Sequence, residues 1–97
     1  MIKVLKLEDE IKLTGHSDYD ELGKDIVCSA VSSIMITTVN AISKFNKKAI
    51  SYERSNDTSI IKINEKDDIT LNLIDNMMEL LVELSKKYPK NIIVKER

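Results

Sequence analysis

The residue types best suited to covalent chemistry lie together in one short segment of the sequence. The chain has one cysteine, Cys28, one histidine, His16, and two glycines, Gly15 and Gly23, all in this segment. A cysteine thiolate is a strong nucleophile, and a nearby imidazole can take the thiol proton and later protonate a leaving group. The 11 residues between the histidine and the cysteine are enough to let them meet. The segment is therefore a candidate site for acyl transfer through a Cys/His pair.

The elements on either side of this segment determine where the two side chains lie. Apolar residues recur at helical spacing over 25–46, without glycine or proline, so this range is predicted to be a helix. Asp25 is a good N-cap type, which would make Cys28 the third helical residue. Free N–H groups and the helix dipole favour a thiolate there, and the same N–H groups are expected to hold an oxyanion. Gly15 ends a predicted strand just before His16, where backbone angles closed to other residues become available.

Other residues near the pair have more than one expected role. Asp25 is expected to cap the helix, to orient His16, or both. Ser32 lies one helical turn beyond Cys28, where it can bond near the thiol or to a carbonyl of its own helix. Gly23 is expected to hinge the connecting segment. Acidic residues in the segment oppose activation, because nearby carboxylates raise the pKa of a thiol. These residues are Asp18, Asp20, Glu21 and Asp25.

Composition and spacing alone leave the catalytic interpretation open. A lone cysteine in an apolar helix is commonly a small buried hydrophobe, and a lone histidine beside a glycine is commonly a turn or core residue. One cysteine, one histidine and loop carboxylates match no familiar zinc-ligand spacing, so a zinc site is not expected.

The remaining sequence predicts a small α+β domain. A second helix is expected over 69–88, where apolar residues again follow helical spacing, and Pro89 ends it. Short runs of apolar residues predict strands at 2–7, 10–14, 49–54, 59–64 and 91–95, with a turn at 55–58. The β-β-α-β-β-α-β order predicts a single two-layer domain over 1–97, with two helices packed on one largely antiparallel mixed sheet.

Charge and composition narrow the expected partners and compartment. The formal net charge is −1 and there is no basic run, so no direct nucleic-acid contact is expected. The single cysteine cannot form an internal disulfide, which removes the usual reason to favour an oxidising compartment. The stretch 26–43 carries no charge, but seven serine, threonine and asparagine residues interrupt it, so a buried helix is expected and not a membrane span. No signal peptide is predicted, and the cytoplasm is the expected location.

The segment around the pair resembles the signature of the bacterial ribosomal-processing cysteine protease family. That signature reads Gly-His-Ala-Gly-Tyr and then Gly-x-Asp-Ile-Val-Cys-x-x-Val-Ser. This chain has Gly-His-Ser-Asp-Tyr at 15–19 and Gly-Lys-Asp-Ile-Val-Cys-Ser-Ala-Val-Ser at 23–32, with the same His-to-Cys spacing. The resemblance implies a homodimeric endopeptidase without metal or organic cofactor. Such an enzyme removes a short N-terminal extension from a large-subunit ribosomal protein, cutting just beyond an aromatic-rich stretch.

The resemblance also assigns roles to individual residues. It implies that Cys28 is the nucleophile and His16 the general base, with Asp25 and Ser32 as supporting residues. Ser17 and Asp18 stand where the family has alanine and glycine, which puts substrate preference in question.

Some roles and two other functions stay open. Tyr19 and Leu22 are candidate walls of an apolar substrate groove, or they only pack the loop onto the domain. The chain could also be a non-catalytic, ribosome-associated peptide-binding module. A third possibility is a structural dimer that uses the uncharged helix as its interface.

Overall fold

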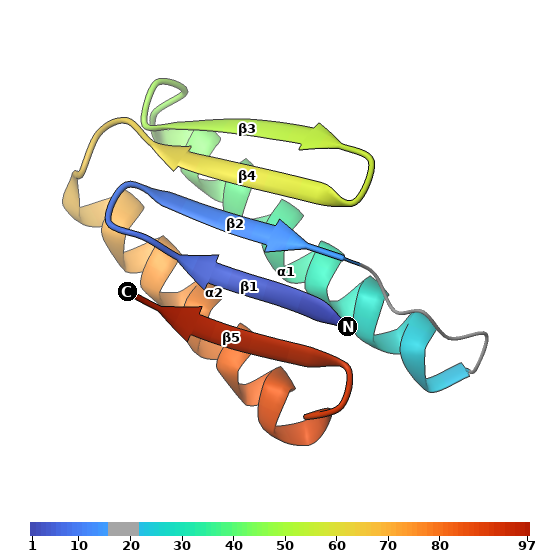
Figure 1. Cartoon of the computed structure of the whole chain (residues 1–97). Coiled ribbons are helices and arrows are strands. Elements are labelled where there is room, and N and C mark those ends of the chain that lie inside the picture. The colour runs from blue at the N-terminus through green and yellow to red at the C-terminus, as the bar shows by residue number, and fades with distance from the viewer. Residues whose placement is uncertain (16–21) are drawn as a thin grey trace.

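Two helices cover one face of a five-stranded sheet, so the chain forms two layers (Figure 1). The computed structural model describes residues 1–15 and 22–97, and for 22–25 it describes the backbone alone. Along the chain the elements are β1 (Ile2–Lys6), β2 (Glu10–Thr14), α1 (Leu22–Phe45), β3 (Ile50–Ser55), β4 (Thr58–Ile63), α2 (Asp68–Lys87) and β5 (Ile92–Glu96). The predicted element order and α+β class are confirmed.

The sheet is mixed, with strand order β3-β4-β2-β1-β5. β1 with β2, β2 with β4, and β3 with β4 pair antiparallel. β1 and β5 instead run parallel, with Ile2 opposite Ile92 and Lys6 opposite Glu96. The first and last strands of the chain therefore lie side by side.

A tight hairpin joins β3 to β4. Ser55 lies opposite Thr58, so only Asn56 and Asp57 connect the two strands. Asn56 has a φ of 45°, and asparagine is one of the few non-glycine residues that adopt this left-handed conformation readily. The turn lies where the sequence predicts it, at the same end of the sheet as the N-terminal half of α1 (Figure 1).

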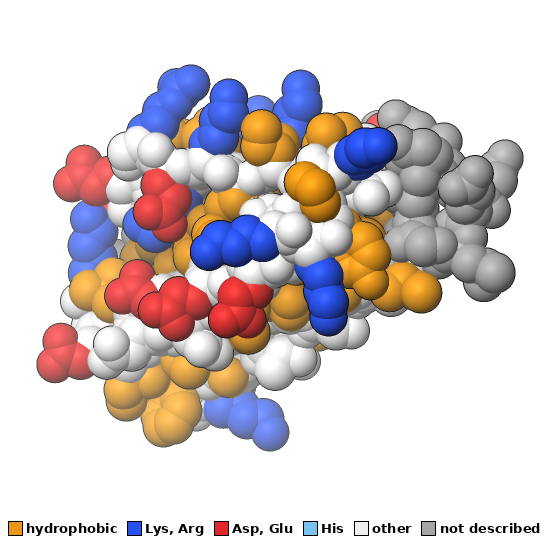
Figure 2. All heavy atoms as spheres, turned by 90° about the horizontal axis from the view of Figure 1, so that it is seen from below, with side chains coloured by type: hydrophobic (Ala, Val, Ile, Leu, Met, Phe, Trp, Pro, Cys, Tyr) orange, Lys and Arg blue, Asp and Glu red, His pale blue; other side chains and the backbone are white. Residues whose placement is uncertain are grey.

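The core lies between the two layers, because alternate strand residues point toward the helices. The buried apolar residues of the strands are Ile2, Val4, Ile11, Leu13, Ile50, Ile61, Ile63 and Ile92. Those of the helices are Val27, Val31, Met35, Ile42, Ile74, Met77, Met78 and Leu81. The intervening strand residues face away from the helices. In Figure 2 this outer face forms the upper edge of the molecule, where lysine and arginine side chains project among hydrophobic ones.

Local side-chain and backbone contacts define the ends of α2. Its N-cap, Asp67, accepts a hydrogen bond at 2.8 Å from the backbone N–H of Thr70 and another at 3.0 Å from the Thr70 hydroxyl. At the other end, the N–H of Tyr88 donates to the carbonyl of Leu84 at 2.9 Å, and Pro89 follows. Proline cannot continue the helical hydrogen-bond ladder. The observed helix, Asp68–Lys87, thus differs from the predicted range 69–88 by only one residue at each end.

α1 begins earlier than predicted. It starts at Leu22, so the prediction that Asp25 is the N-cap is wrong, and Gly23 lies within the helix instead of hinging a segment before it. Leucine and lysine are good helix formers, and one glycine costs only about 1 kcal/mol relative to alanine, so the helix can extend back through 22–24. Asp25 still lies in the first turn, a place where a carboxylate is favourable.

α1 is also unusually apolar. From Ile26 to Phe45 it is long and apolar enough to span a membrane, with a mean hydropathy of 1.7, although core helices of soluble proteins satisfy the same criterion. Here one side of α1 packs on the sheet and on α2, through buried residues such as Val27 and Ile42.

Candidate active site

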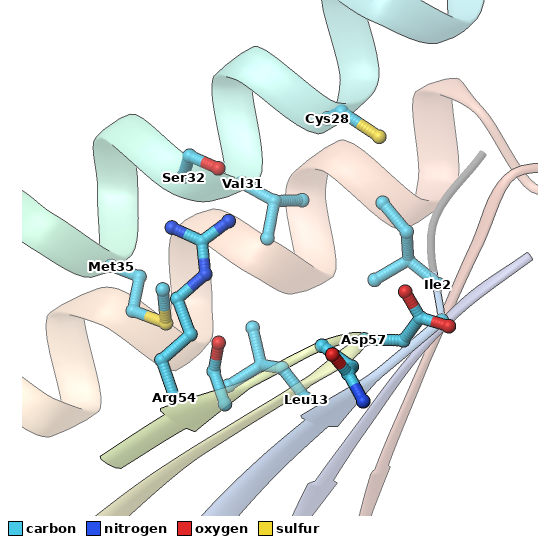
Figure 3. A pocket seen from close by; sticks show the side chains of 11 residues that line it. Ile2, Leu13, Cys28, Val31, Ser32, Met35, Arg54 and Asp57 are labelled. Atoms are coloured by element: carbon cyan, nitrogen blue, oxygen red, sulfur yellow. The ribbon is translucent and has the colours of Figure 1, made fainter. Parts of the chain in front are cut away.

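A cavity of about 300 Å³ opens between α1 and the end of the sheet that carries the β3–β4 turn (Figure 3). Its apolar lining comes from both layers, through Ile2, Leu13, Val31 and Met35. The other lining residues are Gly15, Cys28, Ser32, Arg54, Asn56, Asp57 and Ser59. The cavity thus brings together three of the predicted site residues, Gly15, Cys28 and Ser32.

Cys28 lies at the boundary between the core and the cavity. It is half-buried, packs against the hydrophobic core and forms no disulfide. Ser32 lies one turn further along α1 and is exposed, and Figure 3 shows both side chains on the cavity side of the helix. The sulfur is therefore positioned by core packing while it borders a space that a peptide could enter. A nucleophile requires such access to its substrate, and the predicted base, His16, lies outside the described residues.

The position of Cys28 along α1 differs from the prediction. Because the helix begins at Leu22, Cys28 is its seventh residue and not its third. In an α-helix the N–H of a seventh residue bonds to the carbonyl four residues earlier, and the dipole effect is concentrated in the first turn. The predicted thiolate and oxyanion sites at free N–H groups beside Cys28 are therefore wrong for this geometry. The sulfur of Cys28 borders the cavity, but it does not lie at the free N–H groups of the helix end.

Gly15 occupies a position that only glycine fits. Its φ is 85°, and a Cβ on this residue would overlap the backbone carbonyl oxygen of Met1. Its N–H donates a hydrogen bond at 2.9 Å to the carbonyl of Asp57 in the β3–β4 turn. The predicted need for glycine at the end of this strand is confirmed. The chain just before residue 16 thus lies close to Met1 on one side and is hydrogen-bonded to the hairpin turn on the other.

The remaining predicted site residues divide into two groups. His16 and Tyr19 lie outside the described residues, so their roles as base and substrate contact stay predictions. Leu22, Gly23 and Asp25 lie in the first turn of α1, so Leu22 is not part of a loop as expected. Among the residues that the structure describes, no group of three or more His, Cys, Asp or Glu side chains could hold a metal ion.

The sequence reasoning missed the residues that the hairpin contributes to the cavity. Arg54, Asn56, Asp57 and Ser59 all line it. The residue types at 54–59 predict only a turn, because nothing in this short segment indicates which helix the turn lies near. One signal was available for Arg54. It follows Ile50 and Tyr52 at a spacing of two, and so belongs to the strand face that elsewhere carries apolar residues.

The fold and the cavity define a small α+β protein with a half-buried cysteine beside a cavity of about 300 Å³, a geometry compatible with a cysteine peptidase. The model of the family described as "Cysteine protease Prp" matches residues 1–93. The chain therefore belongs to this family, and the resemblance inferred from the sequence is confirmed.

Known relatives and solved structures agree with this assignment. The chain is 28% identical over 96 residues to the "Ribosomal processing cysteine protease Prp" of two Staphylococcus aureus strains, covering 91% of each chain. It is similar to a structure of S. aureus Prp with a covalently linked product peptide (23% identity, TM-score 0.88) and to one with a substrate peptide (22% identity, TM-score 0.89). Each comparison covers 100% of this chain and 100% of the other chain. It is also similar to SMU.848 from Streptococcus mutans (23%, TM-score 0.81), covering 98% of this chain and 90% of that one. At these identities, the structural likenesses establish the fold.

Proposed function

We propose that this chain is an endopeptidase that removes the N-terminal extension of a large-subunit ribosomal protein. The observation that carries the proposal is the position of Cys28, whose sulfur borders a cavity in a chain of a cysteine protease family. The curated S. aureus relatives are named as ribosomal processing proteases, and a structure of S. aureus Prp holds a covalently linked product peptide. Both support the choice of a peptide substrate from the ribosome.

The proposed reaction is acyl transfer in two steps. The sulfur of Cys28 bonds to the carbonyl carbon of the scissile peptide while His16 takes the thiol proton. The carbon–nitrogen bond then breaks, and the same proton passes to the leaving amine. Water next attacks the thioester, which releases a carboxylic acid and returns the thiol. These two steps require no oxidant, reductant or metal.

The test is mass spectrometry of the extended ribosomal protein after incubation with the wild-type chain and with Cys28→Ala. We expect the wild type to release the extension and Cys28→Ala to release none, because no other thiol exists in the chain. Ser29→Ala is the matched control, since Ser29 is exposed and lies next to Cys28 in the same helix but does not line the cavity. It should cut at close to the wild-type rate.

The result also separates the competing functions. A chain that binds the extended protein and leaves it intact would be a peptide-binding module. Cleavage by Cys28→Ala at the wild-type rate would refute the peptidase mechanism outright. Circular dichroism of the variant confirms that any loss of cleavage is not a loss of fold.

The same proposal includes a homodimer that acts in the cytoplasm. The family resemblance supports the dimer, and so does the exposed side of α1 over residues 26–43, which carries no charged residue and where Ile36 is 44% exposed. The single cysteine and the absence of a structural disulfide fit a reducing compartment.

A further inference from the structure

Arg54 occupies an unusual place in the sheet. In β3, Ile50 and Tyr52 point to the helix side, and the period of two places Arg54 on the same side. Arg54 pairs with Ser59 of β4, and Ser59 pairs with Leu13 of β2. Two polar residues thus replace the apolar core at this end of the inner face. A charged residue on a core-facing side calls for an explanation, whereas an arginine on the outer face would not.

The cavity explains why Arg54 is tolerated there. Arg54 lines the cavity and stays exposed to solvent through it, so its charge is not buried. Figure 3 shows the guanidinium reaching from β3 toward α1, close to Val31 and Ser32 and about one turn along the helix from Cys28. The carboxylate of Asp57 lies on the other side of the opening, near Ile2. The cavity is therefore polarised, with its positive end against α1.

The guanidinium is also available to a ligand. Among residues 1–15 and 26–97, whose side chains the structure describes, the side chain of Arg54 forms no hydrogen bond or ion pair, and no other cation lines the cavity. Arginine stays charged at all physiological pH values and offers five N–H donors in a rigid plane, which suits a carboxylate or a side-chain amide oxygen. A lysine or arginine of the substrate would meet the same charge and be repelled.

From these observations we infer that Arg54 is a specificity-determining residue of the peptidase. It selects a substrate that carries a hydrogen-bond acceptor, a carboxylate best and an amide next, within a few residues of the bond that Cys28 attacks. The apolar part of the cavity holds a neighbouring apolar side chain. This inference rests on the proposed peptidase function, and it adds the chemistry by which the substrate is chosen.

The experiment compares peptides that span the cleavage site of the extended ribosomal protein. Glu, Gln or Lys replaces the native residue at each flanking position in turn, and kcat/KM is measured for wild type, Arg54→Gln and Arg54→Glu. We expect the wild type to prefer Glu over Lys at one position by roughly tenfold, the scale of a charge-assisted hydrogen bond that is partly screened by solvent. Arg54→Gln should remove this preference, and Arg54→Glu should reverse it in favour of Lys.

Arg97→Gln provides the matched control. It removes the same type of charge from the other face of the sheet, where Arg97 lines a groove with Lys3 and Lys95, and it should keep the wild-type preference. A preference that survives in Arg54→Glu would overturn the inference, and so would an equal loss on Glu and Lys peptides, which would indicate a structural role. If wild type cut neither the peptides nor the intact extended protein, the proposed function itself would fail, and the inference with it.

Discussion

Single residues around the cavity are constrained to very different degrees. Gly15 is held by its φ of 85°, by the nearness of the Met1 carbonyl and by a hydrogen bond to Asp57. Cys28 is half-buried and packs against the core. Arg54 is fixed through the strand backbone, and its side chain is exposed. The residue next to the predicted base is thus the most rigid of the three, and the proposed specificity residue is the most adaptable.

Replacing Gly15 by alanine tests this rigidity. We expect Gly15→Ala to lower the free energy of unfolding by about 2 kcal/mol, because the added Cβ meets a backbone atom and the positive φ is strained. Urea denaturation measures the change. Gly23→Ala is the control, since the same substitution within α1 should instead stabilise the chain, by up to about 1 kcal/mol. Equal stabilities for Gly15→Ala and wild type would contradict the described geometry.

Among the elements, the two helices differ in how clearly their sequences define where they begin and end. α2 has a clear apolar stripe, a capping aspartate and two lysines in its last turn, so its sequence defines both its ends. α1 has no comparable signal at its start, and it carries apolar or small polar residues on every side. The helix that presents the cysteine is therefore positioned by packing more than by local sequence.

The cap of α2 makes a prediction about pH. Hydrogen bonds from the Thr70 backbone N–H and hydroxyl hold the pKa of the Asp67 carboxyl below its usual range. The capping contribution is therefore complete above the unfolded pKa of about 3.9 and is lost as the pH falls through the lower folded value. Asp67→Ala should lower the melting temperature at pH 7, and its difference from wild type should shrink below about pH 4.

The control for this measurement is Asp68→Ala. It removes the adjacent acidic charge in the first turn of α2 and leaves the capping bonds of Asp67 in place. Melting curves recorded by circular dichroism between pH 2 and pH 7 give both comparisons. A difference between Asp67→Ala and wild type that stayed constant over this range would show that the capping contribution of Asp67 does not depend on its ionisation.

On the scale of the whole molecule, the two faces of the fold differ in character. The outer face of the sheet carries basic side chains (Figure 2). Over residues 26–43 the outer side of α1 carries none, and only 28% of the apolar stretch Ile26–Phe45 is buried. Ile26 and Phe45 are 55% and 69% exposed. A long uncharged helix face of this kind is suited to a second copy of the chain, the partner that the proposed homodimer requires.

A charge placed on this face tests the dimer. We expect Ile36→Lys to convert a dimer into a monomer, because it places a solvated charge in the middle of the exposed side of α1. Leu80→Lys is the control, since Leu80 is 40% exposed on α2, close to the 44% of Ile36. Light scattering coupled to size-exclusion chromatography measures the mass of each. A monomeric wild type, or a dimer that survives Ile36→Lys, would rule out α1 as the interface.

The sequence predicts elements better than it predicts their assembly. Alternation and helical spacing place every helix and strand, with Glu10–Thr14 matched at both ends. The start of α1 is missed because Asp25 is an equally good residue for a cap and for a first turn. Strand order is not predictable from local pattern, and the cavity depends on it. Cys28 and Ser32 could be named from their own segment, whereas Arg54 acquires its place only once β3 lies across from α1.

The parallel pairing of β1 with β5 has a consequence for the order in which the sheet forms. Ile2 pairs with Ile92, so this edge of the sheet can form only once the chain has been synthesised through β5. Strand pairing between segments so far apart in the sequence forms slowly. β1, which contributes Ile2 to the cavity wall, can therefore pair with β2 early but gains its second neighbour, β5, only late in folding.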